Sequence, residues 1–315
     1  MISIIIPCYD SFHLKKITRH FEDENEIEVI IVNDNPTRSI SGINASNFRI
    51  INNQENYGPS KSRNIGLQSA NGSIYIFLDS DVYLSLNQVQ YIKEYFEKRN
   101  EISFLTSYLD QNIGENIYSH FKNIYICYQF SKHLGQVDFL YGSMTATNSK
   151  IYWPENKRIV EDNYFGLQLS RANIPIFLSP ELQMKHLKEY TLKSIFLYDL
   201  KISFHMAELI LLKTKEKIGD LNKVTHSNRA HLLALIFLLI TISAWTISYK
   251  ISLISFLCWL TSNISFFEFI KKNKKFSMLK YIPVMTITQL AQMFGAGLGL
   301  IYYSTYKKTS LEEII

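Results

Sequence analysis

The sequence predicts an α/β domain, with a mostly parallel sheet flanked by helices, followed by a small helical membrane domain. Two observations carry this prediction. In residues 1–190, short β-branched runs alternate with polar stretches that are typical of helices, whereas long apolar stretches follow residue 228. Strands that are buried on both faces of a parallel sheet read as continuous apolar runs, and crossover helices join them.

Five short apolar runs predict the strands of the sheet, and two longer stretches predict crossover helices. Their lengths and composition decide between the two types, since β-branched runs of 4–8 residues favour strands. The strands are expected at 2–6, 28–33, 48–52, 74–79 and 102–107, and the helices at 60–70 and 86–100.

Three apolar stretches near the C-terminus each approach the roughly 20 residues that cross a bilayer as a helix. Residues 231–249 carry no Asp, Glu, Lys or Arg, and 251–270 carries a single Glu, so with only Lys250 between them they predict a tight hairpin. The third stretch, 281–303, either spans the bilayer or re-enters it. Its glycines at 295–299 (GAGLG) have the spacing that lets helices pack closely, and we expect packing to be their role.

The charge pattern predicts that the α/β domain faces the cytoplasm at the inner membrane of a cell. Residues 185–229 carry nine Lys and Arg against five Asp and Glu, and four lysines lie within 271–275. Positive residues gather on the cytoplasmic side of membranes, and a hairpin returns both basic regions to that side. The expected organisation is a multi-pass protein with a cytoplasmic domain at 1–190, an amphipathic juxtamembrane region at 191–228, a membrane domain at 229–304 and a tail at 305–315.

Composition and missing motifs exclude several classes of function. The net charge of +5 is mild, and the basic residues adjoin apolar stretches, so a bilayer explains them better than nucleic acid does. The three cysteines are far apart and form no CxxC pair, which argues against a disulfide framework or a zinc site. Neither a dinucleotide-binding glycine motif nor a P-loop is present, so hydride transfer and P-loop chemistry have no support.

The apolar run 74–78 ends in two carboxylates, Asp79 and Asp81, which repel each other. The carboxyl ends of parallel strands form the edge at which open α/β sheets bind ligands. Two carboxylates at that edge can converge on one Mn²⁺ or Mg²⁺ ion, which in turn binds a diphosphate. A D-x-D pair alone is weak evidence, because a solvated turn has the same sequence.

Several segments, in this order, resemble the family 2 glycosyltransferases. They are SIIIPCYD (3–10), EVIIVNDNPT (28–37), NYGPSKSRNIGLQSANGSIYIFLDSD (56–81), VED (160–162) and MKHLKEYTLKS (184–194). The resemblance implies a GT-A fold and a nucleotide-diphosphate sugar as the donor, with a UDP-sugar expected. The last segment and the apolar stretches after it also resemble a membrane-anchored branch of that family.

The resemblance implies roles for individual residues on the donor side. Pro7 and Tyr9 match the end of the first strand, where an aromatic ring lies against the nucleobase. Asp34 matches the carboxylate that accepts a hydrogen bond from the base, and Arg63 matches a cation near the nucleotide. Asp79 matches the carboxylate at the ribose. The alternatives are a turn residue for Asp34 and a surface cation for Arg63.

The metal and the catalytic base are assigned in the same way. Asp81, with Asp79 and His186, matches the set that binds Mn²⁺ or Mg²⁺ and the diphosphate. Asp162 matches the base that takes a proton from the acceptor hydroxyl in an inverting transfer, and Glu161 is the alternative base. Both acids could instead be carboxylates that favour the start of a helix.

The resulting expectation is a metal-dependent, inverting glycosyltransferase that acts on a membrane-associated acceptor, such as a glycolipid or another lipid-linked sugar of surface polysaccharide assembly. Transfer to polyprenyl phosphate is the first alternative, and a sugar nucleotidyltransferase is a second. The loops 109–140 and 142–158 carry no transferable motif for the acceptor. Within them, Trp153 is either a platform for an acceptor sugar or a packed core residue.

Overall fold

The structure, a computed structural model, describes residues 1–110, 114–218, 229–272 and 275–305. These residues form two compact units. The α/β unit comprises Met1–Asp110 and His133–Lys188, and the helical unit comprises the described residues within 111–132 and 189–311.

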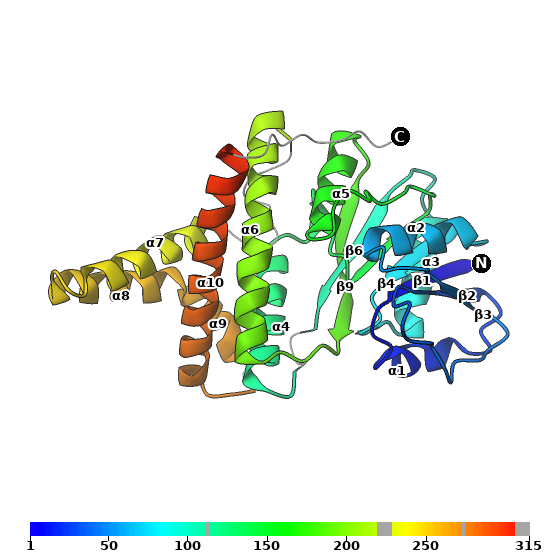
Figure 1. The fold of residues 1–315 in the computed structure, drawn as a ribbon, viewed down its shortest axis with the longest axis horizontal. Helices are drawn as coiled ribbons and strands as arrows, with labels where there is room; N and C mark the ends of the chain where they lie inside the picture. Colours follow the sequence, from blue (N-terminus) through cyan, green and yellow to red (C-terminus); the bar gives the residue numbers. More distant parts are fainter. Residues whose placement is uncertain (111–113, 219–228, 273–274, 306–315) are drawn as a thin grey trace. The chain divides into compact units, whose positions relative to one another are not determined.

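The described strands of the α/β unit form one mixed sheet with the order β3-β2-β1-β4-β8-β6-β9-β5, and β7 pairs with β9 (Figure 1). The strands are β1 (Ile2–Cys8), β2 (Ile27–Asn33), β3 (Phe48–Asn52), β4 (Ile74–Leu78), β5 (Val82–Tyr83), β6 (Phe104–Leu109), β7 (Gly135–Val137), β8 (Met144–Thr147) and β9 (Ile176–His186). The five predicted strands are confirmed as β1, β2, β3, β4 and β6.

Parallel pairing joins β3, β2, β1 and β4, and it also joins β6 to β9. Strand β8 lies antiparallel between β4 and β6, so the sheet is mixed at its centre. Buried aliphatic side chains on β1, β2 and β4 form the main core, because both faces of these strands are covered.

The α/β unit carries five described helical segments: α1 (Leu14–Thr18), the 3₁₀ helix η1 (Arg19–Phe21), α2 (Pro59–Ser69), α3 (Leu86–Glu97) and α5 (Glu161–Arg171). The two predicted helices are confirmed as α2 and α3. A Cβ atom at Gly66 would lie 2.4 Å from Cγ2 of Ile5, so only glycine lets α2 pack this closely on β1. This close approach fixes the helix that carries Arg63.

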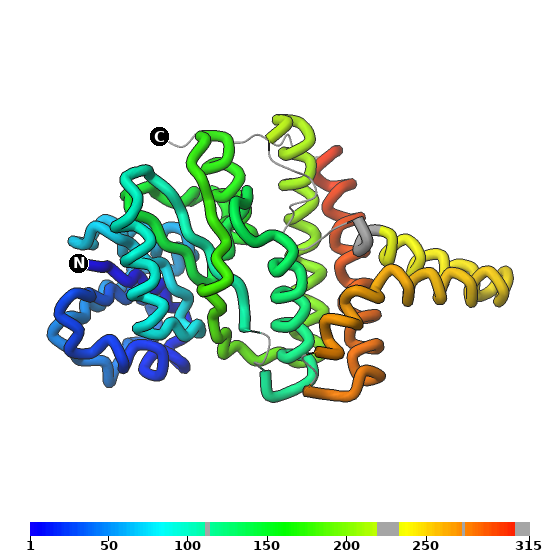
Figure 2. Tube along the Cα trace, turned by 180° about the vertical axis from the view of Figure 1, so that it is seen from behind, coloured from blue at the N-terminus to red at the C-terminus, as the bar shows by residue number. Residues whose placement is uncertain are grey.

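The helical unit contains α4 (Ile117–Phe130), α6 (Leu192–Glu216), α7 (Arg229–Ala244), α8 (Tyr249–Ser262), α9 (Ile264–Lys272) and α10 (Met278–Thr305). Helices α7 and α8 form a hairpin, and α6 lies along α10 (Figures 1 and 2). Aromatic and aliphatic side chains from α4, α6, α7, α8, α9 and α10 share one buried cluster.

Helix α10 is the one described helix that is both long enough and apolar enough to cross a membrane by itself. Helices α8 and α9 pass the same test only as a pair, with a bend of 49° between them. Helix α7 is shorter, with 16 residues, or about 24 Å at 1.5 Å per residue. The structure thus shows the expected hairpin, but its two arms are shorter than the stretches 231–249 and 251–270, and several crossings are not shown.

The packing role expected for the glycine motif at 295–299 is confirmed for its two end glycines, Gly295 and Gly299. A Cβ atom at Gly295 would lie 2.2 Å from the carbonyl oxygen of Leu200, and one at Gly299 would lie 2.2 Å from that of Phe204. Both glycines therefore face the backbone of α6, and their lack of a side chain sets the distance between the two helices.

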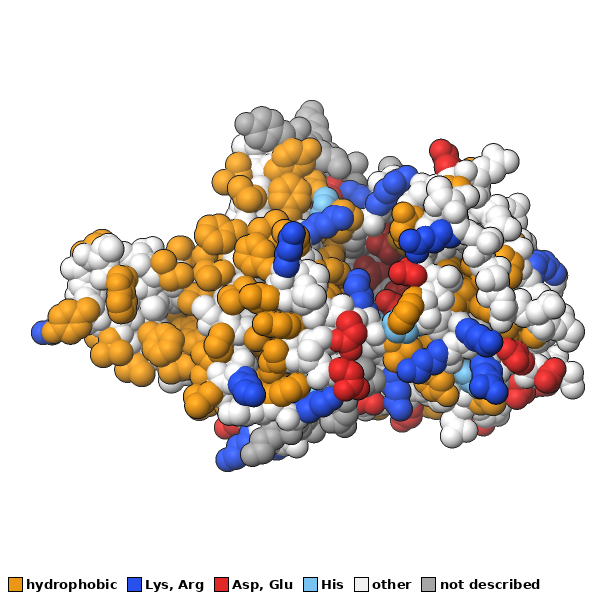
Figure 3. All heavy atoms as spheres, turned by 60° about the horizontal axis from the view of Figure 1, so that its bottom comes forward, with side chains coloured by type: hydrophobic (Ala, Val, Ile, Leu, Met, Phe, Trp, Pro, Cys, Tyr) orange, Lys and Arg blue, Asp and Glu red, His pale blue; other side chains and the backbone are white. Residues whose placement is uncertain are grey.

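The outer surface of the helical unit is strongly apolar. Hydrophobic side chains cover the region of α7 and α8 in the space-filling view (Figure 3). Exposed members of this surface are Leu233, Ile236, Leu239, Ile242, Trp245, Ile247, Ile251, Leu253, Ile254 and Leu257. Soluble proteins seldom expose apolar surface on this scale, so the surface is suited to lipid contact.

The predicted boundary at residue 190 lies next to Lys188, where the α/β unit ends. Two features go beyond that prediction. Helix α4 belongs to the helical unit although it lies within 1–190, and α6 is packed along α10 rather than forming a separate juxtamembrane segment. Residues 219–228 of the expected juxtamembrane region, and 306–315 of the expected tail, lie outside the described residues.

Candidate active site at the carboxyl edge of the sheet

A pocket of about 270 Å³ opens where β1, β2 and β4 end. Since these strands run parallel, their carboxyl ends meet at one edge of the sheet. The residues that line the pocket are Pro7, Cys8, Tyr9, Asp10, Asp34, Pro59, Asp79, Ser80 and Asp81. Five of the nine predicted site residues thus line one pocket: Pro7, Tyr9, Asp34, Asp79 and Asp81.

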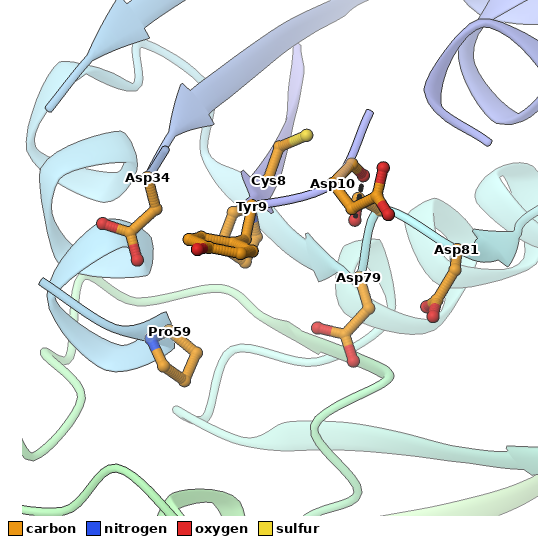
Figure 4. Close-up of a pocket in the computed structure, with 9 residues that line it drawn as sticks. Cys8, Tyr9, Asp10, Asp34, Pro59, Asp79 and Asp81 are labelled. Carbon is orange, nitrogen blue, oxygen red and sulfur yellow. Dashed lines mark hydrogen bonds between the residues drawn. The ribbon is translucent and has the colours of Figure 1, made fainter. Parts of the chain in front are cut away.

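Tyr9 lies at the centre of this pocket (Figure 4). Asp34 and Pro59 lie on one side of its ring, and Asp79 and Asp81 lie on the other. Tyr9 is 58% exposed, although it directly follows the buried strand β1. An exposed aromatic face between two acidic ends is a suitable stacking surface for a planar ring.

Asp34 is buried and organises the loop that precedes α2. Its Oδ1 accepts hydrogen bonds from the backbone N–H of Tyr57 and from Nδ2 of Asn53, both at 2.8 Å, and its Oδ2 accepts one from the N–H of Gly58 at 2.9 Å. Gly58 has φ = +86°, a conformation that favours glycine. A carboxylate has about four acceptor positions, so Asp34 retains capacity for one further donor.

The repulsion between Asp79 and Asp81 is relieved by two different partners. Nη2 of Arg63 lies 2.9 Å from Oδ1 of Asp79, and Nε2 of His186 lies 3.3 Å from Oδ1 of Asp81. Burial raises the pKa of Asp79, and the opposing charge of Arg63 only partly offsets this. Burial also acts to raise the pKa of Asp81, but the hydrogen bond and charge of His186, together with Lys188, outweigh it and lower that pKa.

His186 reaches Asp81 through a short antiparallel ladder. Val82 of β5 pairs with His186 of β9, and the N–H of Leu187 donates to the carbonyl of Asp81 at 2.7 Å. The two-residue strand β5 therefore joins segments about a hundred positions apart in the chain. This pairing brings together two of the three predicted metal ligands, whereas the third, Asp79, is paired with Arg63.

The residues present fit a Mn²⁺ ion in part. Two ligands at adjacent octahedral positions, each about 2.1 Å from the ion, lie about 3.0 Å apart, which is close to the separation of the Asp81 and His186 atoms. A carboxylate together with an imidazole suits Mn²⁺. No group of three or more His, Cys, Asp or Glu side chains with metal-binding geometry occurs among the described residues. A metal here would take its remaining ligands from a diphosphate and water.

The two candidates for the catalytic base, Glu161 and Asp162, are the first two residues of α5. Oδ2 of Asp162 accepts a hydrogen bond from the N–H of Gly142 at 2.8 Å, and its Oδ1 accepts from the N–H of Asn163 at 2.8 Å. Glu161 instead pairs with Arg63, with 3.0 Å between Oε1 and Nη1. Burial, reinforced by the charge of Asp162 and opposed by Arg63, raises the pKa of Glu161 to about 7.

Arg63 is 2% exposed, does not line the pocket and joins the donor side of the site to α5. Trp153 is also 2% exposed, and the Arg63 guanidinium carbon lies 4.3 Å from the centre of its ring. Trp153 further packs against Phe77 and Phe165. The structure therefore selects the packed role for Trp153 over the acceptor platform.

Sequence reasoning missed three residues of this site. Gly142 contacts both Arg63 and Asp162, Asn53 supports Asp34, and Val160 holds a left-handed backbone conformation directly before Glu161. No local sequence signal identifies Asn53 or Val160. Gly142 is a glycine in a loop without a turn motif, so only its neighbours in space reveal its role.

Comparisons with known proteins give related sequences and a related fold. Glycosyl transferase family 2 matches residues 3–160, about half of the chain. TarS of Staphylococcus aureus, a poly(ribitol-phosphate) beta-N-acetylglucosaminyltransferase, is 25% identical over 186 residues, which cover 53% of this chain and 32% of TarS. An uncharacterised glycosyltransferase of Haemophilus influenzae is 28% identical over 112 residues, or 33% of this chain and 37% of that protein. The chain thus spans about a third of the length of the curated relatives it matches.

Among solved structures, the mannosyltransferase PcManGT of Pyrobaculum calidifontis, in complex with GDP-Man and Mn²⁺, superposes with a TM-score of 0.61. The alignment covers 96% of this chain and 87% of that chain at 11% identity, and it shows a shared fold. The predicted GT-A fold, an α/β domain followed by a helical region, is thereby confirmed. By its sequence match over residues 3–160, which include every residue that lines the pocket, the chain belongs to glycosyl transferase family 2.

Proposed function

We propose that this protein is an inverting glycosyltransferase that transfers a sugar from a nucleotide-diphosphate donor, with a UDP-sugar expected, to a lipid-linked acceptor at the inner cell membrane. The observation that carries the proposal is the pocket itself. It combines an exposed aromatic ring, Tyr9, with the buried acceptor Asp34 on one side and the carboxylates Asp79 and Asp81 on the other. A nucleobase, a ribose and a diphosphate need these groups in this order.

The residues of the pocket each have a defined task in donor binding. The nucleobase stacks on Tyr9 beside Pro7, and a base N–H donates to the remaining acceptor position of Asp34. The ribose hydroxyls donate to Asp79, whose side chain is 32% exposed despite its bond to Arg63. The diphosphate lies toward Asp81 and His186, where Lys188 lowers the negative potential.

Asp81 and His186, with Asp79 near them, would hold the Mn²⁺ or Mg²⁺ ion. When bound, such an ion neutralises the charge that develops on the leaving diphosphate. Lys185 and Lys188 flank His186 and add positive charge at the same end of the pocket.

Asp162 is the proposed base, and Glu161 is not. The carboxylate of Glu161 is held in an ion pair by the guanidinium of Arg63, which competes with an acceptor hydroxyl for the same oxygens. Asp162 accepts only hydrogen bonds from neutral N–H groups and keeps capacity to take a proton from the acceptor hydroxyl.

The helical unit supports a membrane-associated acceptor. Among the described residues it carries an extended apolar surface and one helix long enough and apolar enough to span a bilayer, α10, along which α6 packs. We therefore propose that the unit anchors the enzyme in the membrane, with the α/β unit in the cytoplasm. A glycolipid or a polyprenyl-diphosphate oligosaccharide is the expected acceptor, and polyprenyl phosphate is the alternative. Membership of family 2 argues against a sugar nucleotidyltransferase.

Asp162→Asn tests the chemistry. It keeps nearly the same shape and removes the proton acceptor, so transfer should fall by roughly 10²–10⁴-fold while donor affinity persists. Glu161→Gln is the matched control, because glutamine can still accept the bond from Arg63, and it should cost much less. Near wild-type transfer in Asp162→Asn, together with a large loss in Glu161→Gln, would assign the base to Glu161.

The acceptor is tested by incubating membranes that contain the protein with several nucleotide sugars and then analysing extracted lipids by mass spectrometry. A sugar added to a glycolipid or to a lipid-linked oligosaccharide supports the proposal. A product formed only on polyprenyl phosphate would select the alternative. Release of diphosphate from a nucleoside triphosphate would instead identify a nucleotidyltransferase.

A further inference from the structure

Arg63 holds one buried positive charge between two parts of the site that lie far apart in the chain. Its Nη2 donates to Oδ1 of Asp79 at 2.9 Å, at the end of β4, and its Nη1 donates to Oε1 of Glu161 at 3.0 Å, at the start of α5. The planar guanidinium can serve both carboxylates at once, which an ammonium group cannot do with the same geometry. Because the side chain is 2% exposed, solvent does not compete for these bonds.

Gly142 connects Arg63 to the proposed base. The carbonyl oxygen of Gly142 accepts a second bond from Nη2 of Arg63 at 3.2 Å, and its N–H donates to Oδ2 of Asp162 at 2.8 Å. A Cβ atom at this position would lie 3.2 Å from Oδ2 of Asp162 and 3.3 Å from Nη2 of Arg63. A side chain here would crowd both groups, so glycine lets the backbone of this residue bond to Arg63 and to Asp162 at the same time.

Val160 shows that the start of α5 is held in place by its surroundings. It has φ = 52° and ψ = 28°, a left-handed conformation that is a clear outlier for a β-branched residue. Such strain persists only where neighbouring contacts over-determine the backbone. The next two residues, Glu161 and Asp162, make those contacts with Arg63 and with Gly142.

We propose that Arg63 is a positioning residue that joins the donor carboxylate Asp79 to the start of α5, and so fixes Asp162 relative to the bound donor. This inference rests on the proposed function and deepens it. It replaces the direct nucleotide contact that the family resemblance implies for Arg63. In this arrangement Arg63 touches neither substrate, and its effect on transfer passes through Gly142 and Glu161.

Arg63→Lys is the first test, because it keeps the charge but can bridge only one carboxylate well. We expect kcat to fall by roughly 10²-fold, as for a misplaced reacting group, and the affinity for UDP to fall much less, because lysine keeps a cation beside Asp79. The pH profile of kcat should shift, because Arg63 opposes the raised pKa of Glu161 and a lysine that bridges the two carboxylates less well opposes it less. Arg49→Lys is the matched control, because Arg49 is an exposed arginine bonded to the carbonyl of Ser69.

Val160→Gly is the second test, and it remains informative if Arg63→Lys folds poorly. Glycine relieves the left-handed strain, so the melting temperature should stay equal or rise while kcat falls. Val160→Ala removes the same branched side chain and keeps the strain, so it separates backbone freedom from lost packing. A melting-temperature gain from Val160→Gly should be smaller in the Arg63→Lys background, because Arg63 enforces the strain.

The outcomes separate the two proposals. Loss of UDP affinity in Arg63→Lys with unchanged kcat would overturn the positioning role and restore a nucleotide contact. Unchanged kcat and pH profile in both variants would also overturn it. Donor hydrolysis, measured beside transfer, keeps the test independent of the acceptor. If the wild-type protein neither transfers nor hydrolyses the donor, the proposed function fails. The positioning role is then decided by the melting temperatures of Val160→Gly, Arg63→Lys and the double variant alone.

Discussion

The packing of α10 on α6 can be tested with two glycines of the same helix. Gly299 faces the α6 backbone, and an added Cβ atom would lie 2.2 Å from the carbonyl oxygen of Phe204 and 2.9 Å from Cβ of Ala207. Gly297, two residues earlier, has no atom within 4 Å of the same added Cβ position. The substitutions Gly299→Ala and Gly297→Ala are therefore chemically identical and differ only in what the new methyl group meets.

The magnitude follows from this difference. Real Cβ atoms essentially never approach another atom closer than 3.0 Å, so α10 and α6 must separate by about 0.8 Å in Gly299→Ala. Overpacking of this kind costs about 1–3 kcal/mol. Both variants gain up to about 1 kcal/mol from the better helix propensity of alanine, and this gain cancels in the comparison. Gly299→Ala should therefore be about 1–3 kcal/mol less stable than Gly297→Ala.

Thermal unfolding of the detergent-purified proteins measures this difference. At roughly 2–4 °C per kcal/mol for a unit of this size, Gly299→Ala should melt about 2–12 °C below Gly297→Ala. The donor affinity of both variants should match that of the wild type, because the pocket lies in the α/β unit. Equal melting temperatures for the two variants would refute the close packing of α10 on α6.

Three further measurements test the site and the anchor. The raised pKa of Glu161 means that the folded protein keeps a proton that the unfolded chain loses near pH 4.5. The melting temperature should therefore fall as the pH rises from about 4.5 through about 7. Glu161→Gln removes this titration and should flatten the slope. A slope that is the same in Glu161→Gln would contradict the assignment. Asp81→Asn should weaken UDP binding in the presence of Mn²⁺ and abolish the sensitivity of that binding to a chelator. Asp10→Asn, in the same pocket, is the control and should change neither property. UDP binding to the wild type that a chelator does not affect would remove the metal role. The full chain should stay with membranes through high-salt and alkaline washes and leave them only in detergent, and release by salt alone would exclude a spanning helix.

The sequence by itself determined the elements of the α/β unit and the residues of its pocket. Apolar runs predict β1, β2, β3, β4 and β6 because burial on both faces of a strand leaves a local signal in composition. Asp34 directly follows the buried run of β2, Asp79 directly follows that of β4, and Asp81 lies two residues further, so their place at the carboxyl edge follows from strand direction. The family resemblance then supplied their chemical roles.

Only the tertiary structure decided which of these residues act on one another. The family resemblance grouped Asp81 with His186, but their contact depends on β5, a strand of two residues whose pairing with β9 is set by the surrounding sheet. The partners of Arg63 depend on where β4 and α5 end in space, and nothing near Arg63 in the chain specifies either. The membership of α4 in the helical unit has the same origin, because its apolar face is satisfied by residues more than a hundred positions away. Patterns along the chain record how each segment is buried, whereas pairing energies arise between segments. Composition therefore predicted the strands, whereas the bonds of Arg63 to Asp79 and Glu161 became visible only in the structure.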